Sequence, residues 1–236
     1  MNRITANQDG GLTRRSALLK FGGLAAALAA GGLKVGNDEA GAATGGPAGV
    51  ASGAVTCVLT PELTEGPYYL PNEKVRRNLT EGRPGTPLTL RTTVVDASTC
   101  KPIKNAAVDI WHCDALGVYS GVQGNTGTFL RGIQKTDAKG LALFQTVYPG
   151  WYTGRAVHIH VKVHIGGNVL HTGQLFFPDT LTDTVYRKAP YNSRGARNTR
   201  NAGDSIYRNG GSKGLLSLRK NVTAYVGAIT MGVHRS

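Results

Sequence analysis

Short runs in which apolar and polar residues alternate recur along the chain between residues 88 and 177. Side chains on a strand point alternately to its two faces, so such runs are typical of strands with one buried face. Turn-forming residues separate them, as at 137–140 and 166–168. The pattern therefore predicts strands over residues 88–96, 107–113, 129–135, 141–146, 157–165 and 169–177.

Regularly spaced short strands without a long helical period predict an all-β fold. We expect a β-sandwich of the transthyretin or immunoglobulin-like type with long loops, formed by one domain over residues 57–236. Residues 215–229 are the place where a short helix followed by a strand is expected.

The N-terminal residues have the pattern of an export signal. Arg14 and Arg15 precede an apolar run at 21–33 that is rich in small residues, and an A-x-A pattern follows at 40–42. Paired arginines specify the bacterial Tat type. We predict a signal peptide over 1–42, a Gly/Ala-rich linker over 43–56, and a mature protein outside the cell or in its envelope, not in the membrane. An N-terminal amphipathic helix or an uncleaved anchor is the alternative.

The chain is strongly basic, with 27 Lys and Arg against 14 Asp and Glu. Such a balance points to nucleic acid or an acidic surface as a partner. Nine of the cations lie in residues 187–220, where Asp204 is the single acid. This stretch has neither a recognition-helix pattern nor an aromatic ladder, so nucleic acid is not the predicted partner. A solvated basic surface loop is expected there, and attraction of an anionic substrate or polymer surface is the alternative.

Three cysteines, Cys57, Cys100 and Cys113, indicate one disulfide and one free thiol in an exported chain. All three pairings are open. Cys57–Cys100 is favoured, because Cys113 lies close in sequence to a candidate metal ligand described below. The spacing of Cys and His residues does not fit a structural zinc site.

His158 and His160 lie on one predicted strand and on the same face of it, with Cα atoms roughly 6.5 Å apart. Two imidazoles at this spacing can converge on one metal ion, and His164 on the same face is a rival ligand. Tyr119 and Tyr152 stand upstream. Phenolate is a hard anionic donor, so two phenolates with two imidazoles suit a hard trivalent iron better than zinc.

Several motifs occur together in a fixed order: Thr-Glu-Gly-Pro-Tyr-Tyr at 64–69, the run 109–119, Thr-Asp at 136–137 with a following glycine, Pro-Gly-Trp-Tyr at 149–152, and Arg-Ala-Val-His-Ile-His at 155–160. With these motifs the sequence resembles the intradiol ring-cleavage dioxygenases, the family of catechol 1,2-dioxygenase and protocatechuate 3,4-dioxygenase. It looks most similar to the small exported branch of that family.

The resemblance implies a non-haem Fe(III) held by Tyr119, Tyr152, His158 and His160. It implies that Tyr152 is the exchangeable ligand that accepts a substrate proton. Arg155 would stabilise negative charge on the ring, and Gln174 would assist by hydrogen bonding. His112 is expected to be structural. Three further residues are candidates for the pocket wall: Pro67, Tyr68 and Tyr69.

The implied reaction takes a small aromatic diol and O2, and cleaves the ring between its hydroxyl-bearing carbons to a muconate-type dicarboxylate. The chain departs from the cytosolic catechol enzymes in having no room for their N-terminal helical dimerisation segment, and the segment between Tyr152 and His158 is short. Two alternatives are a secreted sandwich that binds iron or catecholates without turnover, and a basic polymer-adhering protein without metal.

Overall fold

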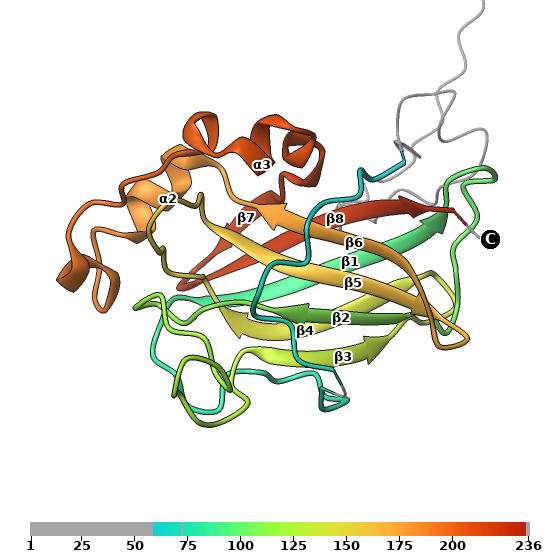
Figure 1. The fold of residues 1–236 in the computed structure, drawn as a ribbon, viewed down its shortest axis with the longest axis horizontal. Helices are drawn as coiled ribbons and strands as arrows, with labels where there is room; N and C mark the ends of the chain where they lie inside the picture. Colours follow the sequence, from blue (N-terminus) through green and yellow to red (C-terminus); the bar gives the residue numbers. More distant parts are fainter. Residues whose placement is uncertain (1–58, 72, 235–236) are drawn as a thin grey trace, which may run out of the picture. The chain divides into compact units, whose positions relative to one another are not determined.

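Two four-stranded sheets pack face to face in the part of the chain that the computed structural model describes, residues 59–71 and 73–234 (Figure 1). One sheet has the order β4-β1-β8-β7 and the other the order β3-β2-β5-β6. Their strands are β1 (Pro87–Asp96), β2 (Ala107–Trp111), β3 (Arg131–Lys135), β4 (Leu141–Val147), β5 (His158–Ile165), β6 (Asn168–Phe176), β7 (Ser217–Asn221) and β8 (Ala224–Val233). The predicted signal peptide 1–42 and linker 43–56 lie outside the described residues.

The core lies between the two sheets and takes every second side chain of the central strands. Leu90 and Phe144 from one sheet meet Ile110, Ile159 and Val161 from the other, and all five are fully buried. Burying such a side chain stabilises the fold by about 1.5–3 kcal/mol. The alternation in the sequence and the sandwich in the structure therefore agree, and the predicted all-β fold is confirmed.

Residues 215–229 were expected to begin with a helix, and this expectation is wrong. They form β7 and most of β8, which pair as an antiparallel hairpin from Ser217–Ala228 to Asn221–Ala224. Val222, with φ of 38°, lies in the two-residue turn between them. Leu216 and Leu218, two residues apart, both face the core, as in a strand. The apolar residues of this segment therefore follow the strand period of two and not the helical period.

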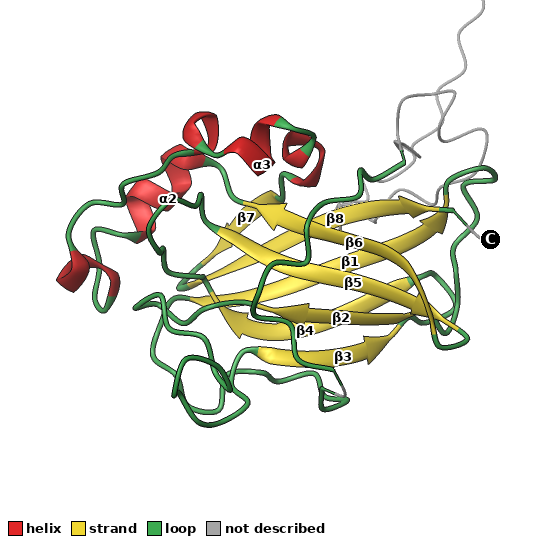
Figure 2. Ribbon diagram, viewed as in Figure 1, coloured by secondary structure: helices red, strands yellow, loops and turns green. Residues whose placement is uncertain are grey.

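Within residues 59–71 and 73–234, every helix lies between β6 and β7 in the chain. Figure 2 shows these helices in red. They are α2 (Asp179–Val185), η1 (Tyr191–Arg194), η2 (Asn201–Gly203), α3 (Ser205–Arg208) and η3 (Gly211–Gly214). None of the helices in the described ranges is long and apolar enough to cross a membrane.

The basic stretch 187–220 exposes most of its cations, as expected, but some of its side chains pack against the sandwich. The ring of Tyr191 is buried, and its hydroxyl donates to the carbonyl of Tyr148 at 2.7 Å. Arg197 is only 4% exposed and forms ion pairs with Asp179 and Asp183 at 2.5 and 2.8 Å. Buried aromatic and ion-paired side chains hold this stretch against the sandwich, so it is a packed part of the domain and not a free loop.

The cysteines agree with the expectation of a disulfide and a free thiol. Cys100 is disulfide-bonded, whereas Cys113 is free and buried. Burial raises the pKa of the Cys113 thiol to about 12, which makes it unreactive. Cys57 lies outside the described residues.

Candidate active site

The outer face of the sheet β3-β2-β5-β6 carries the candidate chemistry. Trp111 on β2 pairs with His160 on β5, and His160 pairs with Gln174 on β6. Directly paired residues of antiparallel strands point to the same face, so these three side chains lie in one row across the sheet. His158 shares that face by alternation, as predicted, while Ile159 between the two histidines enters the core.

Residues 62–70 cover this outer face, and Figure 1 shows this segment running across the strands. The amide of Leu63 donates to the carbonyl of Thr172 at 2.9 Å, and the side-chain amide of Gln174 donates to the carbonyl of Thr64 at 2.9 Å. Gly66, at φ +75°, passes so close that an added Cβ would lie 3.1 Å from Cε1 of His160. This cover explains why His160 is only 1% exposed on a face that points away from the core.

Four donor side chains converge beneath this cover. Nε2 of His158 lies 3.0 Å from Nε2 of His160 and 3.0 Å from the hydroxyl oxygen of Tyr152. The ring of Tyr119 lies 5.8 Å from the ring of Tyr152 and 6.2 Å from that of His160, between centroids. The structure thus brings together all four residues that the sequence proposed as metal ligands.

The two imidazoles are prepared for metal binding. Nδ1 of His158 lies 2.6 Å from the carbonyl of Ala156, to which its N–H donates, and this leaves Nε2 as the atom with a free electron pair. Burial, with a contribution from Arg155, lowers the pKa of His158 to about 3. Burial and the neighbouring His158 lower the pKa of His160 as well. Both rings are therefore neutral, which is the form that binds metal.

The two phenols complete a donor set that fits a hard trivalent cation. The buried hydroxyl of Tyr119 has no hydrogen-bond partner among the described residues, and an unsatisfied buried hydroxyl is costly. Burial raises the pKa of Tyr119 strongly and that of Tyr152 to about 12. A bound cation would satisfy the first group and lower both pKa values.

The spacing of the donors agrees with this fit. Two donors each about 2.1 Å from one cation and at right angles to each other would be about 3.0 Å apart, which is the separation of the two Nε2 atoms. No group of three or more His, Cys, Asp and Glu side chains in residues 59–71 and 73–234 is placed to hold a metal ion. The tyrosines are therefore essential to the proposed site.

A close backbone approach brings the tyrosines together. The amide of Gly150 donates to the carbonyl of Asp114 at 3.0 Å, and an added Cβ at Gly150 would lie 2.5 Å from the carbonyl oxygens of Asp114 and Ala115. Only glycine fits such a contact. It joins the loop before Tyr152 to the loop before Tyr119.

We expect Gly150→Ala to destabilise the protein by about 1–3 kcal/mol, because the methyl group must displace backbone atoms. Urea unfolding measures this. Gly203→Ala is the matched control, since its Cβ would meet only a methyl group of Thr199 at 3.8 Å. If both variants were equally stable, the close packing of the two loops would not be a requirement of the fold.

Arg155 and Gln174 form a hydrogen-bonded unit beside the histidines. Nη2 of Arg155 donates to the side-chain oxygen of Gln174, and Nη1 lies 3.5 Å from Nε2 of His158. Nε of Arg155 donates to Oδ2 of Asp204 at 2.9 Å. The sequence predicted Arg155 and Gln174 at this site but did not predict Asp204. The signal was present, because Asp204 is the single acid among the nine cations of 187–220.

The other histidines stay outside the cluster. A register shift lies between Val163 and His164, and His164 is half-buried four residues from His160, about 13 Å along the strand. His164 is therefore not brought to the donors. His112 is structural, as expected: its Nδ1–H donates to the carbonyl of Cys113 at 2.8 Å, and its Nε2 accepts from the hydroxyl of Thr146 at 2.7 Å.

The candidate wall residues Tyr68 and Tyr69 lie against the site, while Pro67 between Gly66 and Tyr68 is exposed. The ring of Tyr68 lies 4.8 Å from that of Tyr119 and 6.4 Å from that of Tyr152. Tyr69 packs on Trp111 at 4.9 Å. Tyr68 is thus the wall residue that borders both phenols.

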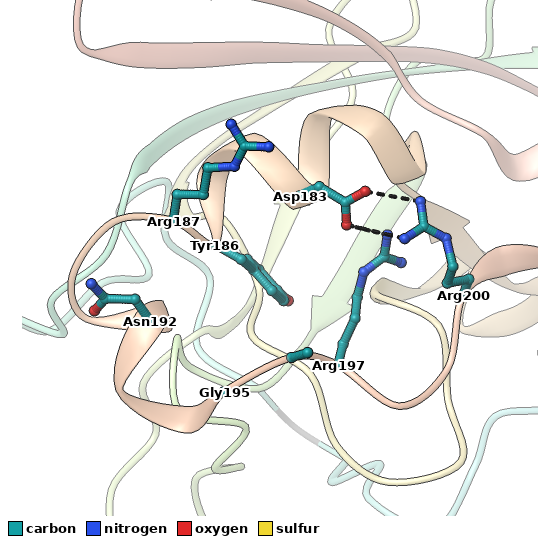
Figure 3. A pocket seen from close by; sticks show the side chains of 8 residues that line it. Asp183, Tyr186, Arg187, Asn192, Gly195, Arg197 and Arg200 are labelled. Carbon is teal, nitrogen blue, oxygen red and sulfur yellow. Dashed lines mark hydrogen bonds and ion pairs between the residues drawn. The ribbon is translucent and has the colours of Figure 1, made fainter.

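A separate pocket of about 270 Å³ lies beside α2 and η1 (Figure 3). Its lining includes Asp183, Tyr186, Arg187, Arg197 and Arg200, and none of the four donors. Asp183 forms ion pairs with Arg197 and Arg200 at 2.8 and 2.9 Å, so much of the positive charge there is compensated. This pocket is distinct from the tyrosine–histidine cluster.

Comparisons with known proteins identify the class. A family model described as "Dioxygenase" matches residues 64–189. Catechol 1,2-dioxygenase 2 of Acinetobacter lwoffii is 36% identical over 99 residues, which are 40% of this chain and 36% of that protein. Chlorocatechol 1,2-dioxygenase of Pseudomonas putida is 28% identical over 135 residues, 48% of this chain and 52% of that protein. The matches thus span about a third to a half of these curated relatives.

A solved structure extends the likeness over most of the chain. The intradiol ring-cleavage dioxygenase from Tetranychus urticae is 35% identical, with a TM-score of 0.72, and the match covers 75% of this chain and 95% of that one. The chain belongs to the intradiol ring-cleavage dioxygenase family, as its motifs suggested.

Proposed function

We propose that the protein is an exported non-haem Fe(III) enzyme that cleaves catechol-type diols between their two hydroxyl-bearing carbons. The observation that carries the proposal is the convergence of two neutral imidazoles and two phenols, with Nε2 of His158 3.0 Å from both His160 and Tyr152. The family to which the chain belongs supports the same reaction class.

Tyr119, Tyr152, His158 and His160 would hold the iron. When bound, the iron would supply a positive charge that lowers the pKa values of the diol hydroxyls and a redox centre for the reaction with O2. Each of the remaining roles belongs to a group of this chain.

Tyr152 is the residue proposed to accept a proton from the diol. Its side chain is half-buried, whereas Tyr119 is only 3% exposed. A phenolate is a base, so Tyr152 would take a proton from a diol hydroxyl. The deeply buried Tyr119 would remain in place.

Arg155 and Gln174 are proposed to stabilise negative charge on the ring. The guanidinium is held by Gln174 on one side and Asp204 on another, so it is oriented before substrate binds. Preorganised charge of this kind lowers a barrier because no reorganisation is needed as the charge develops.

The proposed reaction balances without an external reductant. The bond between the two hydroxyl-bearing carbons breaks, and each of these carbons gains one atom of O2 as it becomes a carboxyl carbon. The diol is oxidised, O2 is reduced, and the product is a muconate-type dicarboxylic acid that contains all atoms of both substrates.

We further propose that the signal at 1–42 exports the protein by the Tat route, on the basis of Arg14, Arg15 and the A-x-A pattern at 40–42. The mature chain would meet its diol outside the cytoplasm. Exposed cations along 187–220, such as Arg187, Lys188 and Arg208, would favour an anionic substrate or a nearby anionic polymer.

Oxygen uptake by purified, iron-loaded protein tests the proposed activity. Catechol, methylcatechols, hydroxyquinol and protocatechuate form the panel, and we expect one O2 consumed for each diol that is lost. A protein that binds iron and catechol but consumes no O2 with any of these diols would instead be a binding module.

A further inference from the structure

The carboxylate of Asp204, in the basic segment 187–220, accepts four hydrogen bonds. Its Oδ2 accepts from Nε of Arg155 at 2.9 Å and from the amide of Ala156 at 2.8 Å. Its Oδ1 accepts from the amides of Ile206 and Tyr207 at 2.8 and 3.1 Å. The side chain is 1% exposed, and these bonds lower its pKa below the ordinary value.

The two oxygens of this carboxylate thus have different partners. Oδ1 is held by the first amides of α3, where Asp204 is the N-cap. Oδ2 faces the start of β5 and receives the side-chain N–H of Arg155 together with the amide of the next residue. The helix therefore fixes the carboxylate, and the carboxylate fixes the guanidinium.

The direction of the Arg155 side chain follows from this arrangement. A guanidinium is planar, so fixing Nε and one Nη nitrogen fixes the orientation of the whole group. Asp204 holds Nε, and Gln174 holds Nη2. Nη1 is then directed toward Nε2 of His158, from which it lies 3.5 Å.

From this geometry we infer that Asp204 is a positioning residue, which orients the Arg155 guanidinium toward the reacting ring and joins segment 187–220 to the active site. The inference rests on the proposed function, in which Arg155 stabilises charge on the ring. Asp204 touches neither substrate nor metal and acts through Arg155.

The first test separates capping from positioning. Serine is a good N-cap but is too short to span the distance to Arg155, so Asp204→Ser keeps the cap of α3 and removes the contact with Nε. We expect kcat/KM to fall by about 10- to 100-fold, because the guanidinium loses its orientation. Iron content should be unchanged. Asp204→Asn, which preserves the shape of the side chain and removes its charge, serves if Asp204→Ser does not fold.

The control is Asp183→Asn. Asp183 is ion-paired in the same region of the molecule, with Arg197 and Arg200, but makes no contact with Arg155 among the described residues. We expect its kcat/KM to stay within about twofold of the unmodified protein, since it acts only on the surface of α2.

A double-mutant cycle distinguishes positioning from a general structural effect. In a protein that already carries Arg155→Gln, adding Asp204→Ser should lower kcat/KM by less than about twofold, because the guanidinium through which Asp204 acts is absent. If its cost were the same in both backgrounds, Asp204 would serve the fold, through Ala156 and α3, and the inference would be overturned.

Hydrogen exchange of the Arg155 side chain tests the role of Asp204 without any enzymatic turnover. In the metal-free full-length chain, the Nε–H resonance of Arg155, assigned by its loss in Arg155→Gln, should exchange slowly with water. In Asp204→Ser it should exchange fast. An unchanged Nε–H signal would contradict the inference. If the unmodified protein failed to open any ring, the proposed function would fail, and this resonance alone would decide the role of Asp204.

Discussion

His160→Gln should lose iron, whereas His164→Gln should retain it. Both histidines lie on β5, two and six residues after its first residue, His158. Nε2 of His160 lies 3.0 Å from that of His158, while His164 follows a register shift and is half-buried away from the donors. Removing a ligand should weaken iron binding by more than about 100-fold, since even residues that only support a ligand contribute 10- to 100-fold.

Metal analysis of the two iron-loaded variants after gel filtration measures this difference directly. We expect about one iron per chain in His164→Gln, as in the unmodified protein, and almost none in His160→Gln. Circular dichroism checks that both variants fold. If His160→Gln kept its iron while His164→Gln lost it, the ligand set would be wrong.

Asp109→Asn should make the protein more stable above pH 7 and should have little effect near pH 4. Asp109 is fully buried on β2. Burial, and secondarily the charge of Glu73, raises its pKa from 3.8 to about 7. Its cross-strand partner Lys162 forms its ion pair with Glu65 instead.

The direction in which stability changes with pH follows from proton binding by Asp109. The folded state holds the Asp109 proton up to about pH 7, whereas the unfolded chain releases it near pH 4, so the folded state loses stability as pH rises through this window. The shift of about three pKa units corresponds to about 4 kcal/mol. Asparagine carries no titrating proton and removes this penalty.

Urea unfolding of the metal-free protein between pH 4 and 8 checks the prediction. The stability of Asp109→Asn relative to the unmodified chain should rise by several kcal/mol across this range. Asp183→Asn is the control: bonds from Arg197 and Arg200 lower the pKa of Asp183 below its ordinary value of 3.8, so the group stays ionised between pH 4 and 8 and the relative stability of this variant should stay constant. A relative stability of Asp109→Asn that stays constant with pH would show that the carboxylate is not protonated in the folded state.

The sequence predicted the sandwich and the shared face of His158 and His160, because both depend on local periodicity. Alternation along β5 places His158 and His160 on one face whatever the rest of the chain does. The tyrosines were harder, since their approach to the histidines depends on the contact of Gly150 with the carbonyls of Asp114 and Ala115. The chemistry of phenolate and the resemblance suggested them, and the structure shows how they are brought together.

Long-range contacts account for what the sequence did not predict. The pairing of Asp204 with Arg155 joins residues 49 positions apart, and no local pattern specifies it. The cover formed by residues 62–70 over a sheet face is equally non-local, and it explains the burial of His160. The hairpin of β7 and β8 was missed for the same reason, because β8 pairs in parallel with β1, far away in sequence.

Labelled oxygen tests the central claim most directly. Iron-loaded protein is given a diol that it consumes together with ¹⁸O₂, and the product is analysed by mass spectrometry. We expect a ring-opened dicarboxylic acid with two ¹⁸O atoms, one in each new carboxyl group. A quinone without label, or an open product that carries an aldehyde from cleavage beside the diol, would contradict the claim.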